Sequence, residues 1–112
     1  MGSVDYRVIA DWSAEDAVRK DIVIGAEHCT REQLIALANH LSLRFVLNPV
    51  VVINIFNDER AALSYDKAQD EQQRAFAFAH WPARYVKSRS IGLNQFVIYP
   101  ACDHSKPEQV DL

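Results

Sequence analysis

The stretch that most limits what this chain can fold into is the run VVVINIF at residues 50–56. Six of its seven residues are β-branched or aromatic, the side chains that favour a pleated strand. A run that is almost wholly of this kind, in contrast to an alternating one, is typical of a strand that is covered on both faces. Pro49 precedes it and marks its start. We therefore predict that residues 50–56 form the central strand of a sheet.

The segment just upstream, TREQLIALANHL at residues 30–41, predicts a helix. Thr30 and Gln33 have the spacing at which two side chains satisfy each other's exposed backbone N–H groups at a helix start. The apolar residues then recur at three-and-four spacing and make one stripe for the core. This stripe consists of Leu34, Leu37, Ala38 and Leu41, with Ile35 beside it.

Two further strands are predicted before this helix. DYRVIADWS at residues 5–13 alternates, which places Tyr6, Val8, Ala10 and Trp12 on one side of an extended chain. VRKDIVIGAE at residues 18–27 resumes a strand after the polar link SAEDA. Because so short a link joins them, the two strands are expected to pair antiparallel.

The second half of the chain predicts helical structure and one last strand. A helical turn fits residues 59–63, and the alanine-rich segment at 67–80 is strong in helix formers. Pro82 ends that helix at His80, and a further helical turn is expected to begin with Pro82 in its first position. QFVIYP at residues 95–100 is the last predicted strand, and the polar tail 103–112 is expected to be frayed.

These elements predict an α+β fold. The expected architecture is a single two-layer domain over residues 1–112, with element order β-β-α-β-α-β. Its sheet is four-stranded and mostly antiparallel, and its two helices pack on one face. A length of 112 residues suits one domain, and an apolar fraction of 49% is enough for a core.

Location and redox state follow from what the chain lacks. No stretch approaches the run of about 20 apolar residues that spans a bilayer, so no membrane partner is expected. The N-terminal segment does not have the pattern of a secretory signal. The two cysteines, Cys29 and Cys102, allow one bridge at most. The default expectation is a cytoplasmic protein with both thiols reduced.

Charge is distributed unevenly along the chain and marks a candidate site. The net charge is −3, yet residues 72–102 hold four basic side chains and no acidic one. On a continuous helix, His80, Arg84 and Lys87 would form one stripe, and Trp81 and Tyr85 would form an aromatic pair. The predicted binding residues are His80, Trp81, Arg84, Tyr85, Lys87 and Arg89. The alternative is a solvated helix end, with the cations favoured by its dipole and the aromatics in the core.

Several classes of site are not expected. With only three glycines the chain has no phosphate-cradling loop, so no cofactor is predicted. His28 and Cys29 are adjacent and Cys102 and His104 are two apart, but the usual closely spaced ligand pairs of metal sites are absent, so no metal site is predicted. Nucleic acid is not the expected partner, because such domains are usually basic overall.

Two functional hypotheses stand at this point. The leading one is a small soluble non-enzymatic interaction or regulatory module, acting as an adaptor, inhibitor or accessory subunit. It would bind an acidic protein surface or a small anion through the basic face, or a partner through a free sheet edge. The second is a small enzyme with His80 as acid or base, Asp58 or Glu59 as a second carboxylate and Arg84 as an anion clamp. Asp58 also fits an N-cap.

Self-association is a third expectation, compatible with either hypothesis. Antiparallel sheets leave edges that pair readily with another chain. Neither the first nor the last predicted strand carries an interior proline that would prevent such pairing. A homodimer through these edges is therefore expected alongside the binding function.

Overall fold

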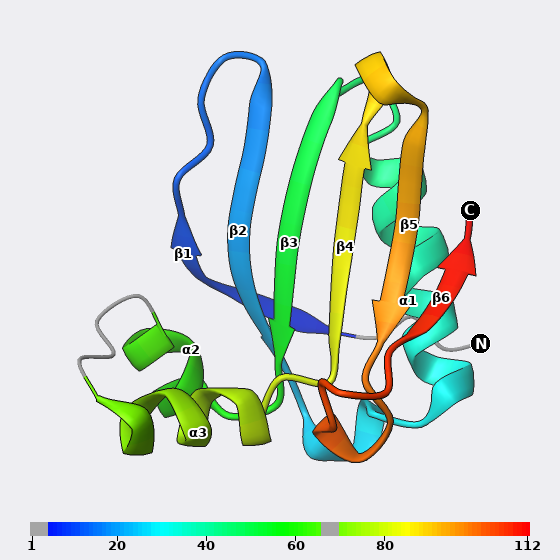
Figure 1. Ribbon diagram of the computed structural model, residues 1–112. Helices are drawn as coiled ribbons and strands as arrows, with labels where there is room; N and C mark the ends of the chain where they lie inside the picture. Colours follow the sequence, from blue (N-terminus) through cyan, green and yellow to red (C-terminus); the bar gives the residue numbers. More distant parts are fainter. Residues whose placement is uncertain (1–4, 66–69) are drawn as a thin grey trace.

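The chain forms one mixed sheet. The computed structural model describes residues 5–65 and 70–112, and within them six strands lie in the order of the sequence (Figure 1). The pair β2–β3 is parallel and is joined by a helix, whereas every other neighbouring pair is antiparallel. The strands are β1 (Tyr6–Asp11), β2 (Ala17–Ile24), β3 (Val50–Phe56), β4 (Ala83–Ser88), β5 (Leu93–Ile98) and β6 (Glu108–Asp111).

The α+β class is confirmed, and the predicted number of elements is corrected. Three α-helices are described: α1 (Arg31–Arg44), α2 (Glu59–Tyr65) and α3 (Glu71–Ala79). The chain also has short 3-10 turns at Ala26–His28, Arg89–Ile91 and Pro100–Cys102. The four-stranded sheet and two helices predicted from the sequence are therefore a six-stranded sheet and three helices among the described residues. Part of the helix predicted over 67–80, namely 67–69, lies outside the described residues.

The helix α1 covers one face of the sheet and builds the main core. It begins where predicted, since the Thr30 hydroxyl accepts a hydrogen bond from the Gln33 N–H at 3.3 Å. Its predicted stripe is buried and packs on side chains of β2 to β5. The central position of β3 is confirmed, and its residues Val51, Ile53 and Ile55 are completely buried on this face.

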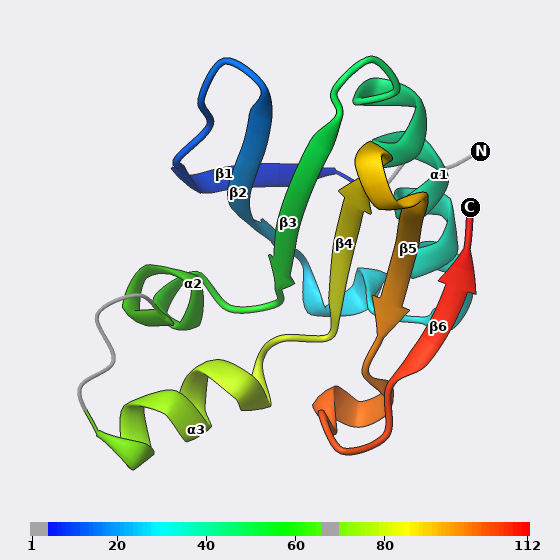
Figure 2. The same ribbon diagram turned by 45° about the horizontal axis from the view of Figure 1, so that its top comes forward.

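The other two helices pack on the opposite side of the sheet. Phe56, Ala61, Ala62 and Trp81 form a second core there, with Val23 of β2 packed against them. The helix α2 begins just after Asp58, whose carboxylate accepts hydrogen bonds from the N–H groups of residues 60 and 61. The prediction that the helices share one face is therefore wrong, because α1 lies on one side and α2 and α3 on the other (Figure 2).

The segment after Pro82 is a strand, which corrects the predicted helical turn. Residues Ala83–Ser88 pair with β3 on one side and β5 on the other. Their β-branched and aromatic members, Tyr85 and Val86, suit a strand better than a helix. The predicted frayed tail is also corrected, because Glu108–Asp111 pairs with β5 as β6.

A bulge in β1 changes which of its residues share a face. Val8 is opposite Ile22 and Ala10 is opposite Asp21, so Ile9 is the extra residue between them. Tyr6 therefore packs against the main core, whereas Trp12 lies on the face opposite α1, beside Asn54. The simple alternation predicted from Tyr6 to Trp12 is interrupted at this point.

Candidate functional site

The basic residues predicted to form one stripe lie on two faces of the sheet. In β4, Arg84 points away from α1, and Lys87 points towards it because of the strand's alternation. The Lys87 ammonium donates hydrogen bonds to the carbonyls of Phe45 and Val46 at 3.1 and 2.9 Å. Arg89 donates to the Val46 carbonyl at 3.2 Å. Lys87 and Arg89 thus stabilise the C-terminal end of α1.

The other predicted site residues are held within the fold. His80 Nδ1 is 2.9 Å from the Asn57 side-chain oxygen. Trp81 is buried in the second core and Tyr85 in the main core, so the two rings do not form one surface patch. The Tyr85 hydroxyl donates a hydrogen bond to the Asn94 side chain at 2.8 Å.

A row of polar side chains crosses the centre of the sheet on the face opposite α1. Asp21 of β2, Asn54 of β3 and Arg84 of β4 are cross-strand neighbours, and we call them the polar row. The Asn54 amide donates a hydrogen bond to the Asp21 carboxylate at 3.0 Å. Neighbouring strands lie about 4.8 Å apart, so the three side chains form a continuous line.

Arg84 is the unusual member of this row. Among residues 5–65 and 70–112, Arg84 has no hydrogen bond or ion pair, although its Nε is buried. The Asn54 side-chain oxygen beside it is also buried without a hydrogen-bond partner in the same part of the chain. The buried donor Nε of Arg84 and the buried acceptor oxygen of Asn54 therefore belong to neighbouring residues on the same face of the sheet. Leaving such groups without a partner costs about 1–3 kcal/mol each.

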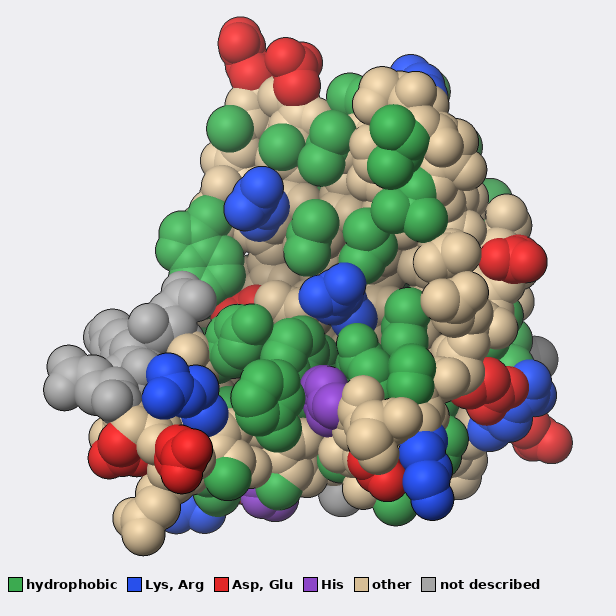
Figure 3. Space-filling model, viewed as in Figure 1, with side chains coloured by type: hydrophobic (Ala, Val, Ile, Leu, Met, Phe, Trp, Pro, Cys, Tyr) green, Lys and Arg blue, Asp and Glu red, His purple; other side chains and the backbone are tan. Residues whose placement is uncertain are grey.

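The surroundings of the polar row are apolar and partly open. A hollow of about 370 Å³ adjoins it, and Trp12 and Val52 form part of its wall. Val86 and Val97 are half-buried neighbours on the same face. Figure 3 shows hydrophobic side chains gathered over β3 to β5 on this face, with Lys or Arg side chains among them. We call this surface, made of the polar row with Trp12, Val52, Val86 and Val97, the open face.

An aromatic cluster borders the open face on the side of α3. Trp81 stacks on Phe78 with ring centroids 5.5 Å apart, and Tyr99 stacks on His104 at 3.8 Å. The Nε2 of His104 donates a hydrogen bond to the Trp81 carbonyl at 2.9 Å. Burial lowers the pKa of His104, and the positive charge of nearby Arg84 lowers this pKa further. His104 is therefore neutral at pH 7, and its Nε2 carries the proton.

The residues of the enzymatic hypothesis make separate contacts within the described part of the chain. Asp58 and Glu59 line a separate hollow of about 470 Å³, to which neither His80 nor Arg84 contributes. Asp58 caps α2, and Glu59 forms an ion pair with Arg7 at 3.0 Å. Among the described residues, no hydrogen bond or ion pair joins His80 to either carboxylate. The geometry thus lends this hypothesis no support.

The four side chains weighed as metal ligands are also separately engaged. His28 Nδ1 is 2.7 Å from the Gln33 side-chain oxygen, and His104 bonds the Trp81 carbonyl. Cys29 and Cys102 line one hollow. In the part of the chain that the structure describes, no three His, Cys, Asp or Glu side chains come together as a metal site.

Comparison with protein-family models, curated proteins and solved structures gives no match. The helices within the described ranges are too short or too polar to cross a membrane. Function is therefore inferred from the geometry of the site alone.

Sequence reasoning identified Arg84 but missed its two neighbours in the polar row. A weak signal for both was present, because Asn54 interrupts the apolar run of β3 and Asp21 lies between apolar residues of β2. The alignment of the three side chains depends on the pairing register, which residue patterns within single segments do not specify.

Proposed function

We propose that this protein is a non-enzymatic interaction module that binds a carboxylate-bearing protein partner through the open face, with Arg84 as the anchor. The observation that carries the proposal is the buried Nε of Arg84, which has no partner among the described residues. Arginine matches a carboxylate with two parallel hydrogen bonds, and such charge-assisted bonds are strong. A partner carboxylate would pair with the Arg84 guanidinium, to which the described residues supply no ion pair.

The surroundings of Arg84 support a protein partner. Half-buried valines and the exposed Trp12 offer apolar contact area around the cation. Interfaces commonly combine an arginine anchor with aromatic and aliphatic neighbours that exclude water. A regulatory or accessory subunit would use such a face without any catalytic group. The chemistry of recognition is the same for a small carboxylate, so the test includes one.

A defined acidic probe tests the proposal. The experiment measures fluorescence anisotropy of a dye-labelled hexaglutamate peptide with the wild type and with the variant Arg84→Gln. Hexaglutamine and succinate serve as the uncharged and the small-molecule probes. We expect binding of hexaglutamate that weakens at about 0.5 M salt, and a loss of about tenfold or more in affinity in Arg84→Gln.

The matched control is Lys87→Gln, three residues further along the same strand but on the opposite face. Circular dichroism confirms that both variants stay folded. The proposal predicts that Lys87→Gln binds hexaglutamate like the wild type. Equal losses in the two variants, or equal binding of hexaglutamine, would contradict it. Tighter binding of succinate than of hexaglutamate would assign the site to a small anion instead.

Self-association remains a separate proposal. The outer strands of the sheet are β1 and β6, and both present an edge to which a second chain could add a strand. Light scattering of the wild type would give the molar mass directly. A homodimer is expected to have twice the mass of one chain, and a single-chain mass at high concentration would exclude it.

A further inference from the structure

Cys29 and Cys102 come together from distant parts of the chain. Cys29 follows the 3-10 turn Ala26–His28, before α1, and Cys102 ends the 3-10 turn Pro100–Cys102, after β5. Both thiols are free, half-buried and line one hollow of about 310 Å³. Leu34 and Ile98 form part of its apolar wall.

The two thiols are within electrostatic reach of each other. Burial is the main reason why the pKa of each thiol is raised, and the charge of Cys29 raises the pKa of Cys102 further. The Cys29 thiol also donates a weak hydrogen bond to the Gly25 carbonyl at 3.7 Å. Both groups are thus protonated at pH 7, and two thiolates side by side would repel each other.

The backbone that carries Cys102 is strained. Ala101 and Cys102 have φ angles of 53° and 57°, in the left-handed region that residues other than glycine rarely adopt. Two such residues in succession persist only where the surrounding structure holds them in place. Here the strained turn holds the Cys102 thiol in the hollow that it shares with Cys29.

We propose that Cys29 and Cys102 form a reversible disulfide that ties the start of α1 to the turn after β5. This modification site goes beyond the proposed binding function and does not depend on it. The oxidant is a small disulfide such as oxidised glutathione. One cysteine thiolate attacks a glutathione sulfur and releases the first reduced glutathione. The second cysteine thiolate attacks the protein sulfur of this mixed disulfide and releases another.

The step is balanced in atoms and electrons. Two protein thiols lose two protons and two electrons, one S–S bond forms in the protein, and one oxidised glutathione becomes two reduced molecules. Because the reaction passes through thiolates, its rate is expected to rise between pH 7 and pH 9. The bond closes a long loop that contains β3, β4, β5 and helices α1, α2 and α3. Oxidation is therefore expected to raise the melting temperature by about 5 °C or more.

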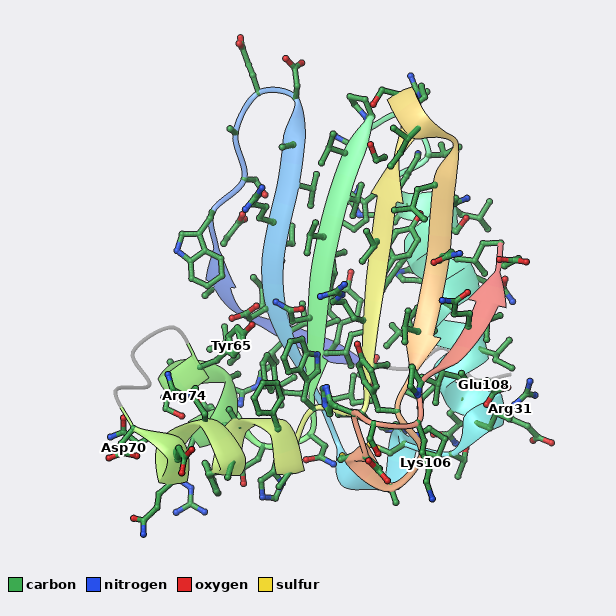
Figure 4. All side chains as sticks on the ribbon, in the orientation of Figure 1. Arg31, Tyr65, Asp70, Arg74, Lys106 and Glu108 are labelled. Carbon is green, nitrogen blue, oxygen red and sulfur yellow. The ribbon has the colours of Figure 1, made fainter. Side chains whose placement is uncertain are left out.

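An ion pair lies beside the hollow and ties the same two regions without a covalent bond. Arg31 at the start of α1 pairs with Glu108 of β6 at 2.6 Å (Figure 4). Both residues also contribute to the wall of the hollow. The side chain of Arg31 holds the pKa of Glu108 below its usual range. This contact links the start of α1, near Cys29, to β6, the strand that follows the Cys102 turn.

In the test, the folded protein is oxidised at low concentration with mixtures of oxidised and reduced glutathione. The reaction is stopped with acid, free thiols are alkylated, and the mass of the intact protein is measured. We expect a loss of about 2 Da without alkylation, a proteolytic fragment joining the two cysteine peptides, and full reversal by dithiothreitol. The variant Cys29→Ser should give only a glutathione adduct at Cys102 and no rise in melting temperature. Glutathione adducts on both wild-type thiols, covalent dimers, or a bond that forms only in denaturant would each overturn the proposal.

Discussion

Replacing Arg84 with methionine should leave the fold as stable as before or make it more stable. Arg84 contributes no hydrogen bond or ion pair within the described residues, and its buried Nε has no partner there. An unsatisfied buried donor costs about 1–3 kcal/mol, and this cost disappears in Arg84→Met. Methionine keeps an unbranched apolar stem of similar reach, so much of the packing is retained.

The expected gain is therefore about 1 kcal/mol in the free energy of unfolding, or about 4 °C in melting temperature. Residues that serve binding are commonly kept at a cost in stability. Lys87→Met provides the contrast, because Lys87 donates two hydrogen bonds to carbonyls at the end of α1. At about 1 kcal/mol for each bond, partly offset by solvent exposure, this variant should lose about 1–2 kcal/mol.

Urea unfolding followed by circular dichroism measures both variants under identical conditions, with the slope of the transition as a check on two-state behaviour. The reasoning holds if Arg84→Met unfolds at the same or a higher urea concentration while Lys87→Met unfolds at a lower one. A loss of more than about 1 kcal/mol in Arg84→Met would refute it, because Arg84 would then have a structural role comparable to that of Lys87.

Two further predictions concern the N-cap of helix α1 and the dependence of stability on pH. Thr30→Ala should lower the free energy of unfolding by about 1 kcal/mol through loss of the α1 cap, and Thr30→Ser should restore most of it in urea titrations. The pKa of His104 is lowered in the folded protein from 6.5, mainly by burial. The stability that the neutral imidazole contributes to the fold is therefore fully present above that pH and is lost as the pH falls below it. His104→Gln should therefore show a shallower loss of stability between about pH 6.5 and pH 5, and an unchanged slope would contradict this assignment.

The local patterns of the sequence predicted the elements that depend least on the rest of the chain. The strand at residues 50–56 and the helix from Thr30 follow from side-chain type and periodicity within one segment, and both are confirmed. Burial of these two segments adds packing energy to a strand or helix preference that the local sequence already has. The same local reasoning identified Asp58 as an N-cap.

The errors arose where distant partners decide the structure. Pro82 fits the first position of a helix, but pairing with β3 and β5 makes the following residues a strand. The tail contains only four strand residues with few apolar groups, and its strand state depends on the ladder with β5. The polar row could not be found from the sequence for the same reason, because the register of β2, β3 and β4 sets which side chains meet.

The measurement that tests the central claim most directly is the ¹⁵N resonance of the Arg84 Nε–Hε group during titration with hexaglutamate. The account predicts that this signal shifts progressively to saturation, while the ammonium signal of Lys87 on the opposite face stays in place. Saturable binding that leaves the Arg84 signal unmoved would contradict the claim that the open face recognises carboxylates through Arg84.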